Sequence, residues 1–220
     1  MRASHRILIT AFLLLSMSAC ASLPRIPFTL IDQDAARIAG FPNARYVLSD
    51  PGAANHLSQQ FERAQSGRGR PTSMLSLSGG GANGAYGAGV LYGWSKSGTR
   101  PQFDIVTGVS TGALSAPFAF LGSAYDEILR DAYTGPQSAN LLSFEGIFAL
   151  FRTSFYSPKP LERLVNGFID DGIVRAVAAE DAKGRRLYVA TTNLDTQAQV
   201  LWDMGAIART GGANALRLFR

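Results

Sequence analysis

The residues Ser78-Gly79-Gly80-Gly81-Ala82-Asn83-Gly84 form a glycine-rich loop whose composition suits the binding of an anion. The loop follows a strand-like run, Met74 to Leu77, and precedes a helix-like run, Ala85 to Ser95. Consecutive glycines let neighbouring backbone N–H groups turn toward one point, and the start of a helix adds partial positive charge there. The pattern therefore predicts a site that stabilises a negative charge.

The spacing Gly79-x-Gly81-x-x-Gly84 also satisfies the glycine fingerprint of dinucleotide-binding folds. Those folds place an acidic residue about 20 positions later at the end of a second strand, whereas Asp104 stands at the start of one. No Gly-Lys-Ser/Thr follows, which excludes a phosphate loop. Taken alone, the loop is equally compatible with a tight strand-to-helix turn that has no function.

Ser110 is the centre of a second motif, Gly108-Val109-Ser110-Thr111-Gly112. The motif lies between a strand-like run, Phe103 to Thr107, and an apolar helix-like run, Thr111 to Leu121. A strand that turns sharply into a helix exposes the serine hydroxyl above the sheet, and small flanking residues accept the strained geometry. We therefore expect Ser110 to be a catalytic nucleophile on an elbow flanked by Gly108 and Gly112.

The base that would activate Ser110 is not evident from the sequence. In α/β-hydrolases the catalytic histidine follows the serine along the chain, but the two histidines here, His5 and His56, both precede Ser110. Either the serine works with a different base, or the catalytic set is incomplete within these 220 residues.

Leu75 to about Asp126 resembles the patatin-like phospholipase family, most closely in the strings Leu77-Ser78-Gly79-Gly80-Gly81-Ala82-Asn83-Gly84-Ala85-Tyr86 and Ile105-Val106-Thr107-Gly108-Val109-Ser110-Thr111-Gly112-Ala113. The resemblance extends over residues 72–220. It implies an α/β fold, a three-layer sandwich around a mostly parallel sheet. It also implies a Ser-Asp dyad without histidine, and an oxyanion hole formed by the backbone N–H groups of Gly79, Gly80 and Gly81. The resemblance implies neither a cofactor nor a metal ion.

Two departures from the family pattern concern charged residues. Asn83 stands where many members carry a basic residue in the glycine loop, and no Asp-Gly-Gly or Asp-Gly-Ala string supplies the expected aspartate. The only Asp-Gly pair, Asp171-Gly172, precedes the helix-like run Ile173 to Glu180, so Asp170 or Asp171 is better explained as a helix N-cap. We expect the sequence to be a fragment and the aspartate to lie beyond Arg220.

From residue 72 onward, short strand-like runs alternate with longer helix-like runs, which is typical of an α/β sheet with crossover helices. Two further strands are predicted, Arg186 to Thr192 and Gln199 to Trp202, with a turn at Asn193 to Thr196. We therefore expect a hydrolase domain over residues 72–220. Residues 20–71, which contain several prolines and a linker-like end, are expected to form a tether with peripheral elements.

An aromatic stripe between Leu141 and Tyr156 has helical spacing: Phe144, Ile147, Phe148, Phe151 and Phe155. Such a stripe is most often a core-facing helix. Contact with lipid chains, or a lid over Ser110, is the functional alternative.

Residues 1–19 are typical of an export signal, with basic residues, a short apolar run from Ile7 to Leu15 and small residues before Cys20. The setting of Cys20, the only cysteine, resembles the bacterial lipobox, in which the cysteine is lipidated and becomes the mature N-terminus. An ordinary secretory peptide is the alternative. With lipidation, the protein would be anchored in the membrane of the bacterial cell envelope, and Ala21 after Cys20 favours the outer membrane, on its periplasmic side.

The charge of the chain is mildly basic, and loss of Arg2 and Arg6 with the signal lowers the formal net charge from +5 to +3. No basic block is longer than Arg185-Arg186, so no nucleic-acid partner is expected. The expected function is serine-dependent hydrolysis of lipid esters, as a phospholipase or esterase, through an acyl-enzyme. The alternative is an envelope lipoprotein that uses the same scaffold for binding without catalysis.

Overall fold

The computed structural model describes residues 29, 31–32, 36–65, 69–135 and 159–220. Within it, Arg37–Arg220 form one compact unit. No helix among the described residues is both long enough and apolar enough to span a bilayer. The predicted signal at residues 1–19, Cys20, and the aromatic stripe at 141–156 lie outside the described residues.

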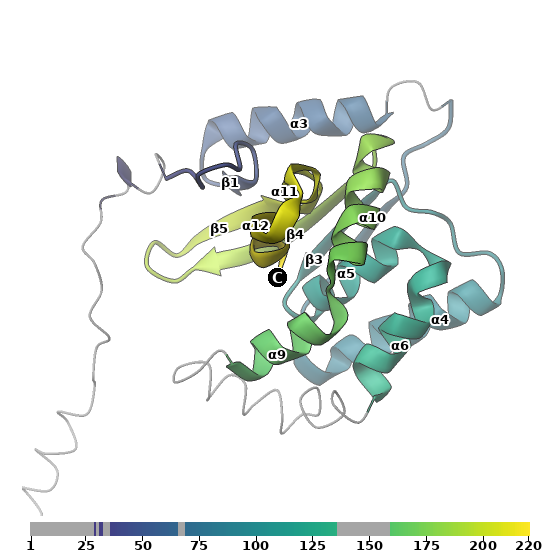
Figure 1. The fold of residues 1–220 in the computed structure, drawn as a ribbon. Coiled ribbons are helices and arrows are strands. Elements are labelled where there is room, and N and C mark those ends of the chain that lie inside the picture. Colours follow the sequence, from purple (N-terminus) through teal and green to yellow (C-terminus); the bar gives the residue numbers. More distant parts are fainter. Residues whose placement is uncertain (1–28, 30, 33–35, 66–68, 136–158) are drawn as a thin grey trace, which may run out of the picture. The chain divides into compact units, whose positions relative to one another are not determined.

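A five-stranded sheet lies at the centre of this unit, with the strand order β1-β5-β4-β3-β2 (Figure 1). The strands are β1 (Arg45–Val47), β2 (Met74–Leu77), β3 (Ile105–Val109), β4 (Arg186–Asn193) and β5 (Ala198–Asp203). β2, β3 and β4 pair in parallel, whereas β5 pairs antiparallel with both β4 and β1. All strands except β5 therefore run in the same direction. The expected α/β class with a mostly parallel sheet is confirmed.

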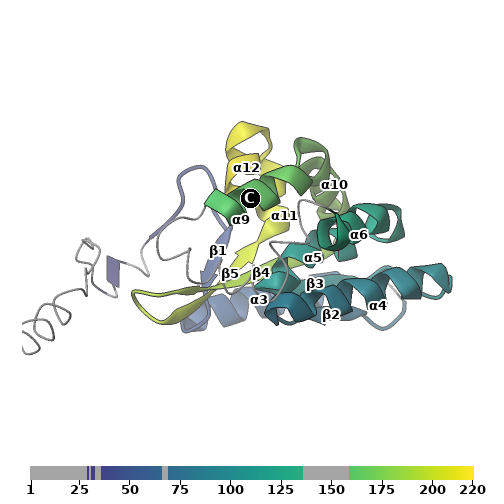
Figure 2. The ribbon, with the colours of Figure 1, turned by 90° about the horizontal axis from the view of Figure 1, so that it is seen from below.

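The sheet is covered on both faces, as the alternation of its side chains requires. In β3 and β4, Ile105 and Tyr188 point to one face, while Val106 and Leu187 point to the other. The first face packs against α3 (Pro51–Gln65) through Leu57 and its neighbours. Figure 2 shows α3 on one side of the sheet and α10 and α12 on the other. The protein is thus a three-layer structure, as expected.

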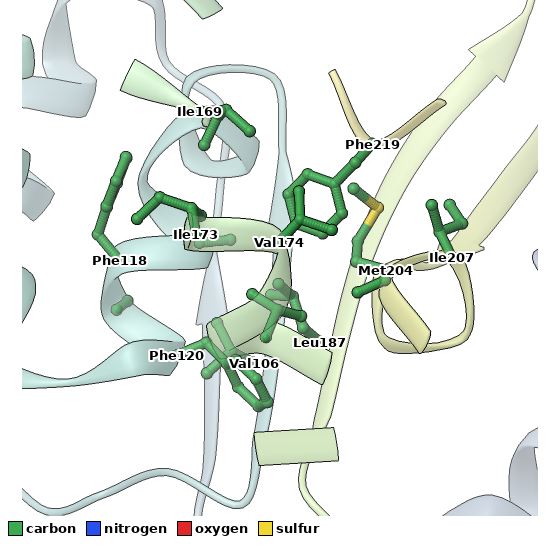
Figure 3. Close-up of a cluster of buried hydrophobic side chains, with 14 of the residues drawn as sticks. Val106, Phe118, Phe120, Ile169, Ile173, Val174, Leu187, Met204, Ile207 and Phe219 are labelled. Carbon is green, nitrogen blue, oxygen red and sulfur yellow. The ribbon is translucent and has the colours of Figure 1, made fainter. Parts of the chain in front are cut away.

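The second face carries the larger core, to which seven helices of the described part of the chain contribute. They are α4 (Gly84–Lys96), α5 (Thr111–Leu121), α6 (Asp126–Thr134), α9 (Lys159–Phe168), α10 (Asp171–Ala182), α11 (Met204–Thr210) and α12 (Gly212–Phe219). Phe120 of α5, Val106 and Leu187 are completely buried in this cluster (Figure 3). Full burial of one such side chain contributes about 1.5–3 kcal/mol, so this face fixes how α5 lies on the sheet.

Most predicted elements match the structure within two residues, and α5 matches its predicted bounds. The predicted strand Phe103 to Thr107 is displaced, because β3 begins at Ile105 and continues to Val109. Asp104 precedes the strand; its buried carboxylate accepts hydrogen bonds from Arg70 at 2.7 Å and from the Ser73 backbone at 2.8 Å. At the other end, Val109 still pairs with β4. The strand therefore reaches the residue immediately before Ser110.

The region predicted as a tether with peripheral elements supplies β1 and α3. β1 pairs with β5 at the edge of the sheet, and the ring of Tyr46 in β1 stacks on His56 of α3 at 4.9 Å. The predicted turn between the last two strands is also present. Asn193 accepts hydrogen bonds there from the backbone of Asp195 and Thr196 through its side-chain oxygen.

Candidate active site

Ser110 occupies the corner between β3 and α5, and its backbone is strained. Its φ is +54° and its ψ is −124°, a region that residues with a β-carbon rarely adopt. A residue held in such a conformation costs about 1–3 kcal/mol and persists only where the surrounding structure fixes it. The residue is exposed, so the hydroxyl is open to a substrate.

The two glycines that flank Ser110 allow this corner to pack against β2. A β-carbon built on Gly112 would lie 2.2 Å from the carbonyl oxygen of Leu77, and one on Gly108 would lie 2.6 Å from the carbonyl oxygen of Gly112. Neither position has room for a side chain. The absence of side chains brings the end of β2, from which the glycine loop departs, directly against the first turn of α5.

The glycine loop lies beside Ser110. A β-carbon on Gly79 would come within 2.9 Å of Ser110 Cβ and 3.5 Å of Ser110 Oγ. Gly81 has a φ of +57°, which turns the chain into the short 3-10 helix η1 (Gly81–Asn83) ahead of α4. Within the described part of the chain, no hydrogen bond uses the N–H groups of Gly79 and Gly80. The loop thus has two unused donors, and one of their residues, Gly79, packs directly against Ser110.

Gly84, the last glycine of the loop motif, brings a third element to the site. A β-carbon on Gly84 would lie 2.8 Å from Thr111 Oγ1 and 3.1 Å from Tyr133 Oη. Tyr133 belongs to α6 and also hydrogen-bonds to the first turn of α5. The sequence motifs did not identify Tyr133, because it lies outside both of them and carries no spacing signal of its own.

An apolar cavity of about 130 Å³ runs along α5, starting one turn after Ser110. Ala113, Leu114, Pro117 and Phe118 form one wall, which covers two successive turns of the helix. Pro117 has no N–H, so the carbonyl of Ala113 lacks its usual helical partner on this wall.

The other walls of the cavity come from α6, α9, β4, α11 and α12. They are formed mainly by Leu164, Val165, Phe168, Ile169, Val189 and Phe219. Val189 pairs with Gly108 of the elbow, which places it next to the nucleophile strand. Phe118, Ile169 and Phe219 also belong to the buried cluster of Figure 3. The cavity therefore lies between α5 and the hydrophobic core, and its lining begins three residues after Ser110.

No base is hydrogen-bonded to the Ser110 hydroxyl among the residues that the structure describes. The predicted capping role near the Asp-Gly pair is confirmed, since Asp170 accepts a hydrogen bond from the backbone N–H of Ile173 at 2.8 Å. Asp171 pairs with Arg175. His56 lies on α3 with its ring against Tyr46.

The buried carboxylates each have a structural partner away from Ser110. Asp126 pairs with Arg100 at 2.6 Å, and Asp181 pairs with Arg186 at 3.2 Å. Asp203 caps α11 through the N–H of Ala206, and burial raises the pKa of its carboxyl group. These groups hold elements together, and the described residues supply no partner for the serine.

Comparison with known proteins finds a matching family model. The family model described as patatin-like phospholipase matches residues 75–209, a segment that contains the glycine loop, the Ser110 elbow, β4 and β5. No curated protein and no solved structure matches the chain.

Proposed function

This chain belongs to the patatin-like phospholipase family, and from that premise we propose that it is a serine-dependent lipid acyl hydrolase with Ser110 as its nucleophile. Patatin-like proteins are lipid acyl hydrolases, which makes hydrolysis the general expectation for this chain. In this proposal Ser110 carries out the reaction, and the substrates are carboxylic esters of lipids.

The observation that carries the proposal is the strained, exposed Ser110 packed beside Gly79. Strain of this kind occurs mainly at functional sites, where a fixed geometry is part of the mechanism. Here it coincides with a neighbouring glycine loop in which the N–H groups of Gly79 and Gly80 are used by no hydrogen bond among the described residues. A serine corner without chemistry would need neither the strain nor the donors.

The proposed reaction has two steps. Ser110 Oγ transfers its proton to a base and attacks the ester carbonyl, whose oxygen becomes negatively charged. The N–H groups of Gly79, Gly80 and Gly81 would hold that oxygen, and the loss of one such donor typically lowers the rate by about 10²–10³-fold. The alcohol leaves with a proton, and water then hydrolyses the acyl-enzyme.

The base in this proposal is the aspartate that the family resemblance implies, and none of the described aspartates is bonded to Ser110. Asn83 is exposed and neutral, so the glycine loop would stabilise the oxyanion with backbone amides and without a nearby cationic side chain at that position. We therefore expect weak dependence of the chemical step on salt concentration, because amide donors carry no net charge.

The apolar cavity supports a lipid acyl group as the substrate. Ala113 and Leu114 lie three and four residues after Ser110, about 4.5–6 Å along the helix axis, so an acyl chain attached to Ser110 could enter between α5 and α9. Burial of each methylene group there contributes about 0.8 kcal/mol. The cavity thus favours esters with an aliphatic acyl chain over acetate esters.

Hydrolysis assays on the native protein test the proposal. We expect release of fatty acid from at least one of four substrates: phospholipid, lysophospholipid, triglyceride or a soluble aliphatic ester. Ser110→Ala should reduce the release to background. The matched change Ser123→Ala, at an exposed serine in the short 3-10 helix η2 (Ser123–Tyr125), should leave it unchanged. Equal activity of the wild type and Ser110→Ala would contradict the role of Ser110.

Binding without catalysis is the second candidate, favoured by the lack of a base on Ser110 among the described residues. This candidate predicts that lipid binds in the cavity and is released unchanged. Equilibrium binding of a fluorescent fatty acid, together with the absence of hydrolysis of all four substrates, would support it over the enzyme.

The proposed location is the bacterial cell envelope, with lipidated Cys20 as the anchor in the outer membrane, on the periplasmic side. Its support is the lipobox-like sequence before Cys20. Metabolic labelling with radioactive palmitate in a bacterial host should label the wild type and not Cys20→Ala. Recovery of labelled Cys20→Ala in the membrane fraction would contradict the anchor.

A further inference from the structure

Tyr133 of α6 reaches across to the turn that carries Ser110. Its hydroxyl donates a hydrogen bond to the carbonyl oxygen of Thr111 at 3.1 Å and lies 2.8 Å from Ser115 Oγ. Ser115 Oγ in turn lies 3.4 Å from the same carbonyl. Thr111 is the residue directly after the nucleophile and the first residue of α5. The three oxygens form a closed triangle at the first turn of this helix.

The same hydroxyl lies against the start of the helix that follows the glycine loop. A β-carbon on Gly84 would come within 3.1 Å of Tyr133 Oη and within 2.8 Å of the Thr111 side chain. The first residue of α4, the first residue of α5 and the end of Tyr133 therefore meet at one point. Burial raises the pKa of Tyr133, so the hydroxyl keeps its proton and remains a donor at neutral pH.

We propose that Tyr133 is a positioning residue whose hydroxyl holds the strained Ser110 corner in register with the glycine loop. The inference rests on the proposed hydrolase function. Ser110 retains its unfavourable φ only while its neighbours fix it, and the flanking glycines provide room without providing a bond. Tyr133 supplies the hydrogen bond from a separate helix, directly to the residue that follows the nucleophile.

The ring and the hydroxyl of Tyr133 have separable roles. The ring lines the apolar cavity beside Ala132 and Leu114. The hydroxyl bonds to Thr111 and Ser115. Replacement by phenylalanine removes the hydrogen bond and keeps the cavity wall. A change in turnover without a change in substrate affinity would therefore report on the positioning role alone.

The test compares the kinetics of Tyr133→Phe and wild type in the native protein, with a soluble butyrate ester and a laurate ester as substrates. Active enzyme is counted with a serine-reactive fluorophosphonate. A small displacement of a catalytic group costs up to about 100-fold in rate, so we expect kcat per active site to fall by roughly 10–100-fold. KM and the butyrate-to-laurate preference should stay unchanged.

Tyr188→Phe is the matched control. Tyr188 is fully buried on the α3 face of the sheet, and its hydroxyl has no hydrogen-bond partner among the described residues. The control removes a buried tyrosine hydroxyl far from the triangle and should leave kcat unchanged. Should Tyr133→Phe fail to fold, Ser115→Ala serves instead. It removes the two bonds that Ser115 makes in the triangle and keeps the bond from Tyr133 to Thr111, so we expect kcat to fall by roughly threefold.

Unchanged kcat in folded Tyr133→Phe, or in Ser115→Ala if the first variant does not fold, would overturn the proposal. The proposal would also be overturned if total activity fell only in proportion to the number of labelled active sites, with kcat per site unchanged. A purely structural residue would give that result. Inactive wild-type protein would instead contradict the proposed hydrolase function.

Discussion

The corner at Ser110 and the hairpin turn between β4 and β5 contain the same unusual backbone feature in different surroundings. Ser110 has a φ of +54° and Gln197 has a φ of +56°, and neither is glycine. The hairpin is held by local hydrogen bonds that the side-chain oxygen of Asn193 accepts from nearby backbone N–H groups, and its Leu194 is largely exposed. The Ser110 corner is instead packed against β2 and bonded to α6.

The comparison distinguishes two kinds of backbone strain. A local turn tolerates the positive φ at Gln197, whereas contacts with distant elements impose the positive φ at Ser110. In the hairpin, the positive φ closes a short connection, which a residue in the left-handed region does readily. At Ser110, elements from distant parts of the chain must all be in place for the conformation to persist. Substitutions at the two corners should therefore differ in both stability and activity.

The largest effect is expected for Gly112→Ala. The added β-carbon would overlap the Leu77 carbonyl, and because backbone cannot yield as a flexible side chain does, we expect a loss of more than about 3 kcal/mol in the free energy of unfolding. Thermal denaturation followed by circular dichroism should show Tm lowered by about 10 °C.

Gly87→Ala, near the start of α4, is the matched control for that change. A β-carbon there meets nothing within 4 Å, so the better helix propensity of alanine should stabilise the protein by about 0.5–1 kcal/mol. If both alanine variants had the same Tm, the close approach of β2 to the elbow would not exist in solution.

A smaller difference in stability is expected between two replacements of the nucleophile. Both Ser110→Ala and Ser110→Gly should abolish hydrolysis, but only glycine relieves the positive φ. After the larger entropy of unfolded glycine is taken into account, we expect Ser110→Gly to be more stable than Ser110→Ala by about 1 kcal/mol. Chemical denaturation of the two variants measures the difference. Greater stability of the alanine variant would show that Ser110 is not strained.

The smallest effect is expected at the other corner. Gln197→Gly relieves a positive φ in an exposed turn, where the gain is partly cancelled by unfolded-state entropy, and should stabilise the protein by about 0.5 kcal/mol. Activity should stay at the wild-type level, as a parallel assay of ester hydrolysis would show. A loss of activity in this variant would mean that the hairpin contributes to the site.

The local parts of this structure could be predicted from the sequence because short-range signals determine them. The glycines mark both turns of the site, the apolar run Thr111 to Leu121 predicts α5, and Asp170 caps α10 as the sequence indicates. The end of β2 and the elbow could be expected to meet, since parallel neighbouring strands end at the same edge of a sheet.

The parts that could not be predicted depend on contacts between distant residues. Nothing in the neighbourhood of Tyr133 shows that its hydroxyl reaches Thr111, because that contact depends on how α6 packs on α5. The predicted strand begins two residues before β3, because the Asp104 network with Arg70 and Ser73 is also long-range. The cavity between α5 and α9 likewise follows from helix packing.

Covalent labelling of the native protein with a fluorophosphonate, followed by mass spectrometry of its peptides, tests the central claim most directly. We expect one modified residue, Ser110, in the folded protein, with no labelling after heat denaturation or in Ser110→Ala. Labelling of a different serine, or no labelling of folded protein that also hydrolyses no ester, would show that Ser110 is not the nucleophile.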